Sequence, residues 1–250
     1  MINNNAINST NCHGGRFGNL FFVGMVLHFI SKNNNLKSSY KDYNKLTKLG
    51  IDLFIGEHTY DDTIELRDNI FYNYIIPENK LYKNISIENN MWGHTKEFAL
   101  FLQNYFNEDI QKNRIINNNI FKDRYNNNND IFIHVRLGDI IPLNLYTPFI
   151  YYDKVLSNIN FDKGYISSDS IENTICQELI KKYNLEIINE DEVTTIMFAT
   201  TCKNIILSSG TFSWLIGLLS YYSNIFYPKI YSEWHGNIFV FPDWKMIDYY

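Results

Sequence analysis

The sequence predicts an α/β protein in which helices cover a parallel sheet. Two observations support this fold class. In the second half, short apolar segments of strand length alternate with segments of helical spacing, which is typical of a parallel sheet with helices on both faces. The chain has 250 residues, of which 45% are hydrophobic and 20% charged, so it can bury the core of one large domain or of two small ones.

The second half follows an Asn-rich polar stretch, residues 113–129, which we interpret as a linker. Beyond it we expect strands at 130–135, 164–167, 185–188, 203–207 and 224–227. We expect the intervening helices at 151–159, 171–183, 193–201 and 211–222. Ligands of parallel sheets bind beyond the carboxyl ends of the strands. The loops after Val135, Ser167 and Leu207 are therefore the expected binding region.

The first half opens with a polar stretch and a glycine-rich turn at 13–19, which is followed by an apolar segment, 20–30, of helical length. We expect short strands at 51–55 and 69–76 and a helix at 96–105, where apolar residues recur at helical spacing. With the Asn-rich linker between the halves, we predict two domains, residues 1–125 and 126–250.

Charge and composition exclude several classes of protein. The net charge of −5 argues against a sequence-independent nucleic-acid binder, so an anionic substrate would need a local basic site. The apolar segment 20–30 is about half the ~20 residues that span a bilayer, and the start shows no secretion signal. We therefore expect a soluble, cytoplasmic protein with no transmembrane segment. The abundance of Asn, Ile and Tyr is typical of AT-rich genomes and fits a viral or AT-rich microbial origin.

Cysteines and histidines give no metal or disulfide pattern. The three cysteines, Cys12, Cys176 and Cys202, are odd in number and widely spaced, which fits a reducing compartment. The scattered histidines do not pair at ligand spacing, and we expect no metal site. These histidines are His28, His58, His94 and His235.

The segment HVRLGD, residues 134–139, is the first candidate for chemistry. It begins at the end of a buried strand, where an unpaired Arg136 would be costly and where its planar guanidinium suits a phosphate or carboxylate. Asp139 could orient Arg136 or act on a substrate hydroxyl. The alternative is a structural ion pair between Arg136 and Asp139 with no functional role.

The segment ILSSGTFSW, residues 206–214, places a Ser/Gly/Thr turn between an apolar strand and a helix. Free backbone N–H groups and the positive end of the helix dipole would meet there and could cradle a phosphate. Hydroxyl groups in the turn would add donors. The alternative is that Ser209 or Thr211 simply caps the helix.

Two weaker motifs complete the set. The turn CHGGRFGN, residues 12–19, has glycines that allow close approach to a ligand, and Arg16 could contact an anion or project into solvent. It has neither the dinucleotide-binding nor the P-loop spacing. In YISSDS, residues 165–170, Asp169 could bind a hydroxyl or cap a helix that begins near Ile171.

These four motifs, in this order, resemble the α-1,2-fucosyltransferases and their superfamily of α-1,2-, α-1,6- and protein O-fucosyltransferases. GGRFGN at 14–19 is similar to the family's first glycine turn, and HVRLGD to its central H-V-R-R-G-D signature. Ser167–Ser170 matches a strand ending in S-D-D. Cys202 followed by SGTFSW at 209–214 matches the last motif, and LQNYF at 102–106 looks like an intervening aromatic-Gln segment.

The resemblance implies a GT-B fold, with two facing Rossmann-like domains and the substrate cleft between them. It implies an inverting, metal-independent glycosyltransferase that uses a nucleotide-diphosphate sugar, GDP-fucose in the family, and a glycan acceptor. Arg136 would hold the donor pyrophosphate, with His134 near the nucleotide. Inversion also needs a general base that accepts the proton of the acceptor hydroxyl, and the sequence does not single one out. Asp139 is our first choice and Asp169 our second. The remaining donor-site residues implied are Gly15, Arg16, Asn19, Ser209, Thr211, Phe212 and Ser213.

Three departures from the family pattern bear on the donor. Leu137 stands where the signature has a second Arg, and Thr195 stands where an acidic residue contacts the nucleobase or ribose. The S-D-D turn reads Ser168-Asp169-Ser170. A different nucleotide-sugar donor, or a non-catalytic nucleotide- or sugar-binding protein, are the alternative hypotheses.

Overall fold

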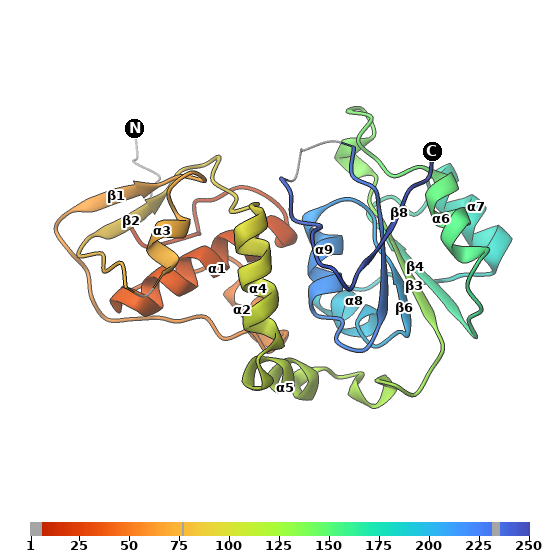
Figure 1. Cartoon of the computed structure of the whole chain (residues 1–250), viewed down its shortest axis with the longest axis horizontal. Coiled ribbons are helices and arrows are strands. Elements are labelled where there is room, and N and C mark those ends of the chain that lie inside the picture. Colours follow the sequence, from red (N-terminus) through yellow and green to blue (C-terminus); the bar gives the residue numbers. More distant parts are fainter. Residues whose placement is uncertain (1–6, 77, 232–235) are drawn as a thin grey trace.

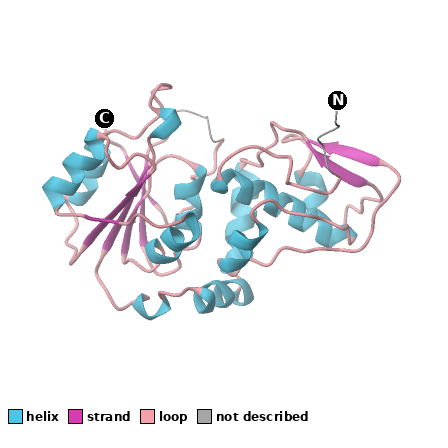
Figure 2. Ribbon diagram, turned by 180° about the vertical axis from the view of Figure 1, so that it is seen from behind, coloured by secondary structure: helices cyan, strands magenta, loops and turns pink. Residues whose placement is uncertain are grey.

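The computed structural model describes residues 7–76, 78–231 and 236–250. It contains two parallel sheets, one of six strands in the second half of the chain and one of two strands in the first half. Figure 1 shows the two halves as lobes that lie side by side, and Figure 2 shows the six-stranded sheet from behind. The predicted α/β class with a parallel sheet is confirmed. The first six residues of the predicted domain 1–125 lie outside the described residues.

The larger sheet contains all five strands that we expected in the second half and one more at the C-terminal edge. Every neighbouring pair is parallel, in the order β5-β4-β3-β6-β7-β8. The strands are β3 (Ile131–Val135), β4 (Gly164–Ser168), β5 (Glu186–Ile187), β6 (Asn204–Ile206), β7 (Asn224–Pro228) and β8 (Lys245–Ile247).

The central strand β3 marks the point where the strand order reverses. The chain runs from β3 outward through β4 to β5, and then returns to the other side of β3 as β6. Such a reversal leaves a crevice at the carboxyl ends of the two strands that flank it, and this is where ligands of open parallel sheets bind. The loops after β3 and β6 border this crevice.

Helices cover both faces of the larger sheet because alternate residues of its buried strands point to opposite sides. Ile131 and Ile133 of β3 belong to one apolar cluster, with α6 (Phe149–Leu156) and α7 (Thr174–Tyr183). Phe132, between them, belongs to the other cluster, with α8 (Glu192–Ala199) and α9 (Thr211–Leu218). All five residues of β3 are buried, as a central strand of this kind requires.

The first half is built around one buried helix, α1 (Phe17–Asn34), rather than around a large sheet. Its two paired strands, β1 (Thr63–Leu66) and β2 (Asn84–Ile87), are parallel. Single parallel bridges, Ser9 with Ser39 and Leu36 with His58, bring further backbone segments alongside. The remaining helices are α2 (Tyr43–Lys48), α3 (Tyr72–Ile75), α4 (Lys96–Asn107) and α5 (Asp109–Asn118), and short 3-10 turns occur at Lys122–Arg124 and Gly138–Ile140.

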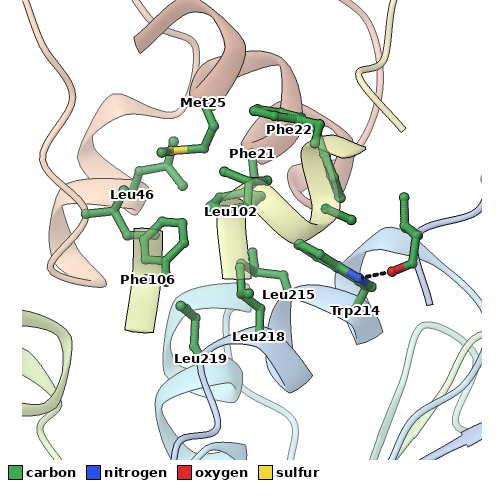
Figure 3. Packing of buried hydrophobic residues seen from close by; sticks show 14 of the residues in the cluster. Phe21, Phe22, Met25, Leu46, Leu102, Phe106, Trp214, Leu215, Leu218 and Leu219 are labelled. Atoms are coloured by element: carbon green, nitrogen blue, oxygen red, sulfur yellow. Dashed lines mark hydrogen bonds between the residues drawn. The ribbon is translucent and has the colours of Figure 1, made fainter. Parts of the chain in front are cut away.

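One continuous apolar core joins the two halves, because α1 packs directly on α9 (Figure 3). Phe22 of α1 lies 4.6 Å from the indole of Trp214, measured between ring centroids. The Trp214 indole N–H donates to the carbonyl oxygen of Ile238, which ties the C-terminal segment to the same core. Full burial of side chains this large stabilises the fold by roughly 1.5–3 kcal/mol each. The relative position of the halves is therefore fixed by packing.

Two expectations for the first half are wrong, and the Asn-rich linker is more structured than its composition suggested. Residues 51–55 form no strand; the Ile51 N–H donates to the Leu46 carbonyl, the Phe54 N–H donates to His28, and the Phe54 carbonyl accepts from Tyr40. Residues 69–76 contain the short helix α3; Phe71, directly before it, and Ile75 at its end are both buried, four residues apart as in a helix. The Asn-rich linker begins inside α5, and Asn119 then donates to the Met197 carbonyl, so this segment is packed against the second half.

We expect Gly18→Ala to destabilise the protein by about 1–3 kcal/mol, because α1 and α9 touch there through backbone. A Cβ at Gly18 would lie 2.5 Å from the Phe212 nitrogen. Gly24→Ala is the matched control in the same helix, since its Cβ would meet only a Leu46 side-chain carbon at 3.6 Å. Urea denaturation measures both, and equal stability of the two variants would contradict this packing.

Candidate functional site

A cleft of about 760 Å³ lies between the two halves at the carboxyl ends of β3, β4 and β6. Its volume is in the range that holds a small organic ligand or cofactor. Side chains and backbone from both halves line it, so neither half forms the cleft alone. All eleven residues predicted from the sequence are among its lining residues: Gly15, Arg16, Asn19, His134, Arg136, Asp139, Asp169, Ser209, Thr211, Phe212 and Ser213.

Hydrogen bonds join the loops after β3 and β6 at the switch point of the sheet. His134 Nδ1 lies 2.5 Å from the Ser213 hydroxyl, and Ser208 and Ser213 hydroxyls are 2.9 Å apart. The Arg136 backbone N–H donates to the Ser208 hydroxyl oxygen at 3.1 Å. These bonds fix the backbone from which the Arg136 side chain enters the cleft.

His134 is a neutral member of this network. Burial, with the positive charge of Arg136 as a second cause, lowers the pKa of His134 to about 3. The imidazole is therefore uncharged at pH 7, and it presents a polar but neutral surface against the ring of Phe212. It contributes hydrogen bonding and shape to the cleft rather than positive charge.

Two arginines and two aspartates form a cluster of four charges across the cleft. From the second half, Arg136 pairs with both Asp139 and Asp169. From the first half, Arg16 reaches the same two carboxylates, with Nη1 2.8 Å from Asp169 Oδ2 and Nη2 3.4 Å from Asp139 Oδ1. The cluster is neutral overall and links the two lobes electrostatically.

The four members differ in exposure. The side chain of Arg136 is 13% exposed and that of Asp169 24%, whereas those of Asp139 and Arg16 are each 60% exposed. Burial and the charge of Arg16 lower the pKa of Arg136, but a guanidinium starts so high that it stays protonated. For Asp139, burial acts to raise the pKa, but Arg136 and Arg16 outweigh it and lower that pKa below its usual value. Asp139 is thus an ionised carboxylate that solvent or a ligand can reach.

Two helix N-termini meet beside this cluster. Helix α1 begins after Arg16 and α9 after Gly210, and in the described part of the chain neither terminus has a side-chain cap. The Thr211 hydroxyl donates to the Asn19 side-chain oxygen at 2.6 Å and holds the two termini together. Uncapped N-termini present backbone N–H groups and partial positive charge, which favour a bound anion.

The structure rules out the helix-cap alternatives left open by the sequence. Ser209 and Thr211 do not cap α9; the Ser209 hydroxyl instead donates to the Leu145 carbonyl. Asp169 does not cap α7, which begins later and is capped by Asn173. It accepts from the Leu137 N–H and pairs with both arginines. The expected ion pair between Arg136 and Asp139 is present, and it lies in the cleft.

Two of the departures from the family pattern have a structural explanation. Leu137 is fully buried in the apolar cluster under α6 and α7, so this position points away from the cleft. Thr195 lines the cleft, is 3% exposed, and donates to the Glu190 carbonyl. Glu190 and Glu192 line the cleft next to it and supply carboxylates at this end.

Sequence reasoning missed the lining residues of the first half beyond the glycine turn. Lys41, Asp42 and Lys45 come from the start of α2, and Lys45 pairs with Glu192 across the cleft at 3.3 Å. Trp92 and His94 come from the loop before α4. No local pattern marks these residues, because the fold alone brings them to the glycine turn.

Comparison with known proteins leaves the family open: no family model, curated protein or solved structure gives a significant match to this chain. Among the described residues, no helix is long and apolar enough to cross a membrane. Within the same residues, no group of three or more His, Cys, Asp or Glu side chains is arranged to hold a metal ion. His235 lies outside the described residues. The three cysteines are free.

We expect His134→Asn to flatten the acid dependence of stability. The unfolded histidine takes up a proton below about pH 6.5 while folded His134 does so only near 3, so stability falls as pH falls through this window. The slope from one such group approaches about 1.4 kcal/mol per pH unit. Denaturant titrations from pH 7 to 4 measure it, with His58→Gln, at an exposed histidine, as control. An unchanged slope in His134→Asn would contradict the assignment.

Proposed function

We propose that this protein is an inverting, metal-independent glycosyltransferase that moves fucose or a related deoxyhexose from a nucleotide-diphosphate donor to a sugar hydroxyl. The observation that carries the proposal is the convergence of Arg136 and two uncapped helix N-termini at the switch point of the sheet. This is an arrangement suited to a diphosphate. The fold proposed with it is GT-B-like, with the donor on residues 126–250 and the acceptor on residues 1–125.

Charge neutralisation is the main chemical task of such an enzyme. When the bond to the sugar breaks, negative charge develops on the departing diphosphate. Arg136 supplies a fixed positive charge, and the N–H groups at the starts of α1 and α9 supply oriented dipoles. Because these groups are held by packing and hydrogen bonds, they need little reorganisation during the reaction.

The general base in this proposal is Asp139, with Asp169 as the second choice. The acceptor oxygen bonds to the anomeric carbon from the face opposite the diphosphate. The bond from that carbon to the phosphate oxygen breaks, its electron pair leaves on that oxygen, and the acceptor proton passes to the carboxylate. Asp139 suits this role better because it is ionised and 60% exposed, whereas Asp169 is more enclosed by the two arginines.

The donor proposed is GDP-fucose, on the resemblance of the four cleft-lining motifs to the fucosyltransferases. Carboxylates of Glu190 and Glu192 beside Thr195 are available to hydrogen-bond a ribose or nucleobase. A different nucleotide sugar on the same site is compatible with these groups.

A second candidate function is nucleotide-sugar binding without transfer. The observation that favours it is the charge balance of the cleft, in which two carboxylates already neutralise the two arginines. In that case the donor would displace the carboxylates from Arg136 and remain intact.

We expect Arg136→Ala to lower turnover of GDP-fucose by roughly 10²–10³-fold, the usual loss when one preorganised charge-stabilising donor is removed. Release of GDP in the presence of an acceptor panel measures turnover, and thermal shift with GDP measures binding. Arg67→Ala is the matched control, because Arg67 is exposed and pairs with Glu65 outside the cleft. Near-native turnover of Arg136→Ala would contradict the mechanism.

We expect Asp139→Asn to separate the two candidate functions. If Asp139 is the general base, its substitution lowers the rate of sugar transfer by about 10²–10⁴-fold. GDP affinity stays equal or rises, because a carboxylate that competes for Arg136 is gone. Asp153→Asn, which removes an exposed pair with Lys182, is the control. Native GDP binding with no turnover of any nucleotide sugar by the unmodified protein would favour the binding function.

A further inference from the structure

Trp92 is a large aromatic residue of the cleft that the mechanism above does not use. Its ring is partly buried and lines the cleft beside the glycine turn. A Cβ at Gly15, where φ is +101°, would lie 2.8 Å from the indole carbon Cζ3, so the ring edge rests on this glycine. The positive φ, which side chains other than that of Gly rarely adopt, and the close indole ring both favour Gly at this position.

The indole is held firmly in place. His13 packs edge-on against it at 4.5 Å between centroids, and His94 lies nearly parallel to it at 6.2 Å. The loop backbone is anchored by Asp68, which accepts from the N–H groups of Trp92 and Gly93 at 3.1 and 2.7 Å. A rigid aromatic side chain at a cleft loses little conformational freedom on binding a ligand.

Trp92 and the charged end of the cleft lie on opposite sides of α1. Gly24 of α1 faces Leu46 of α2, while Val26 faces Gly93 beside Trp92. Successive helical residues are rotated by about 100°, which places these two contacts roughly 160° apart around the helix axis. In the proposed function the diphosphate lies at the start of α1. The end of the cleft with Lys45 and Glu192 is then on one side of the diphosphate, and the end with Trp92 is on the other.

We propose that Trp92 is the stacking platform for the pyranose ring of the acceptor sugar; this inference rests on the proposed glycosyl transfer. The charged end supplies carboxylates and ammonium groups that suit a nucleoside. The Trp92 end supplies an apolar ring whose face attracts the C–H groups of a sugar. Trp92 belongs to the half of the chain opposite Arg136, so a pyranose on it approaches the donor from across the cleft.

The test is saturation-transfer NMR on the full chain with methyl β-D-galactoside, methyl β-D-glucoside and methyl α-D-mannoside, each with and without GDP. We expect saturation to reach the ring C–H protons of at least one glycoside. The signal falls by roughly fivefold or more in Trp92→Leu, which keeps an apolar side chain but removes the aromatic ring, and partly persists in Trp92→Phe. Tyr82→Ala, at an aromatic residue that is 74% exposed and outside the cleft, is the control.

Three results would overturn this assignment: no glycoside contacts the native protein, the signal is equal in Trp92→Leu, or that variant loses its GDP thermal shift while sugar contacts persist. The last result would assign the ring to the nucleobase. Failure of the proposed function has a different signature, in which native protein shows Trp92-dependent sugar contacts but neither a GDP shift nor turnover.

Discussion

The packing of α1 on α9 is the contact on which the rest of the structure depends. It merges the cores of the two lobes through Phe22 and Trp214, and it sets both helix N-termini at the mouth of one cleft. Gly18 permits the backbone approach that this requires. The two helix N-termini then meet at the same cleft, and the anion site that we propose there depends on an apolar contact made elsewhere along the same helices.

The charge cluster adds a second constraint. Arg136 is too enclosed to remain unpaired, and the two aspartates satisfy it when no ligand is bound. Arg16 shares both carboxylates, so the same ion pairs that keep Arg136 oriented also bridge the lobes. An incoming diphosphate would replace these carboxylates with a ligand of stronger charge, and the released Asp139 would then be free to act on a hydroxyl. In the proposed mechanism, orientation of the arginine and release of a base are thus coupled in one cluster.

Much of the second half could be predicted from the sequence because its central strands, β3 and β6, are buried along their whole length. A segment such as DIFIHV has a strong local signal, and the five expected strands are present in one parallel sheet. The first half gave weaker signals. The strands at 63–66 and 84–87 have only four residues each and the first is largely exposed, and the segment around Phe71 follows a helical rather than an extended spacing. In residues 51–55, where we expected a strand, the Phe54 N–H donates to the His28 side chain instead of to a neighbouring strand.

The sequence by itself determined the chemical types at the site, since His134 lies at the end of a strong strand pattern, and Arg136 and the Ser/Gly/Thr turn follow such patterns. Strand order places such loops together, because carboxyl ends of parallel strands share an edge. Only the tertiary structure decided the rest. Trp92, Lys45 and Glu192 are far apart in the chain and carry no local signal, and they line one cleft because α1 is buried between its neighbours. The tertiary structure also decided which charges in the cleft are paired. Arg16 reaches Asp169 only because the packing of the lobes sets the distance between them.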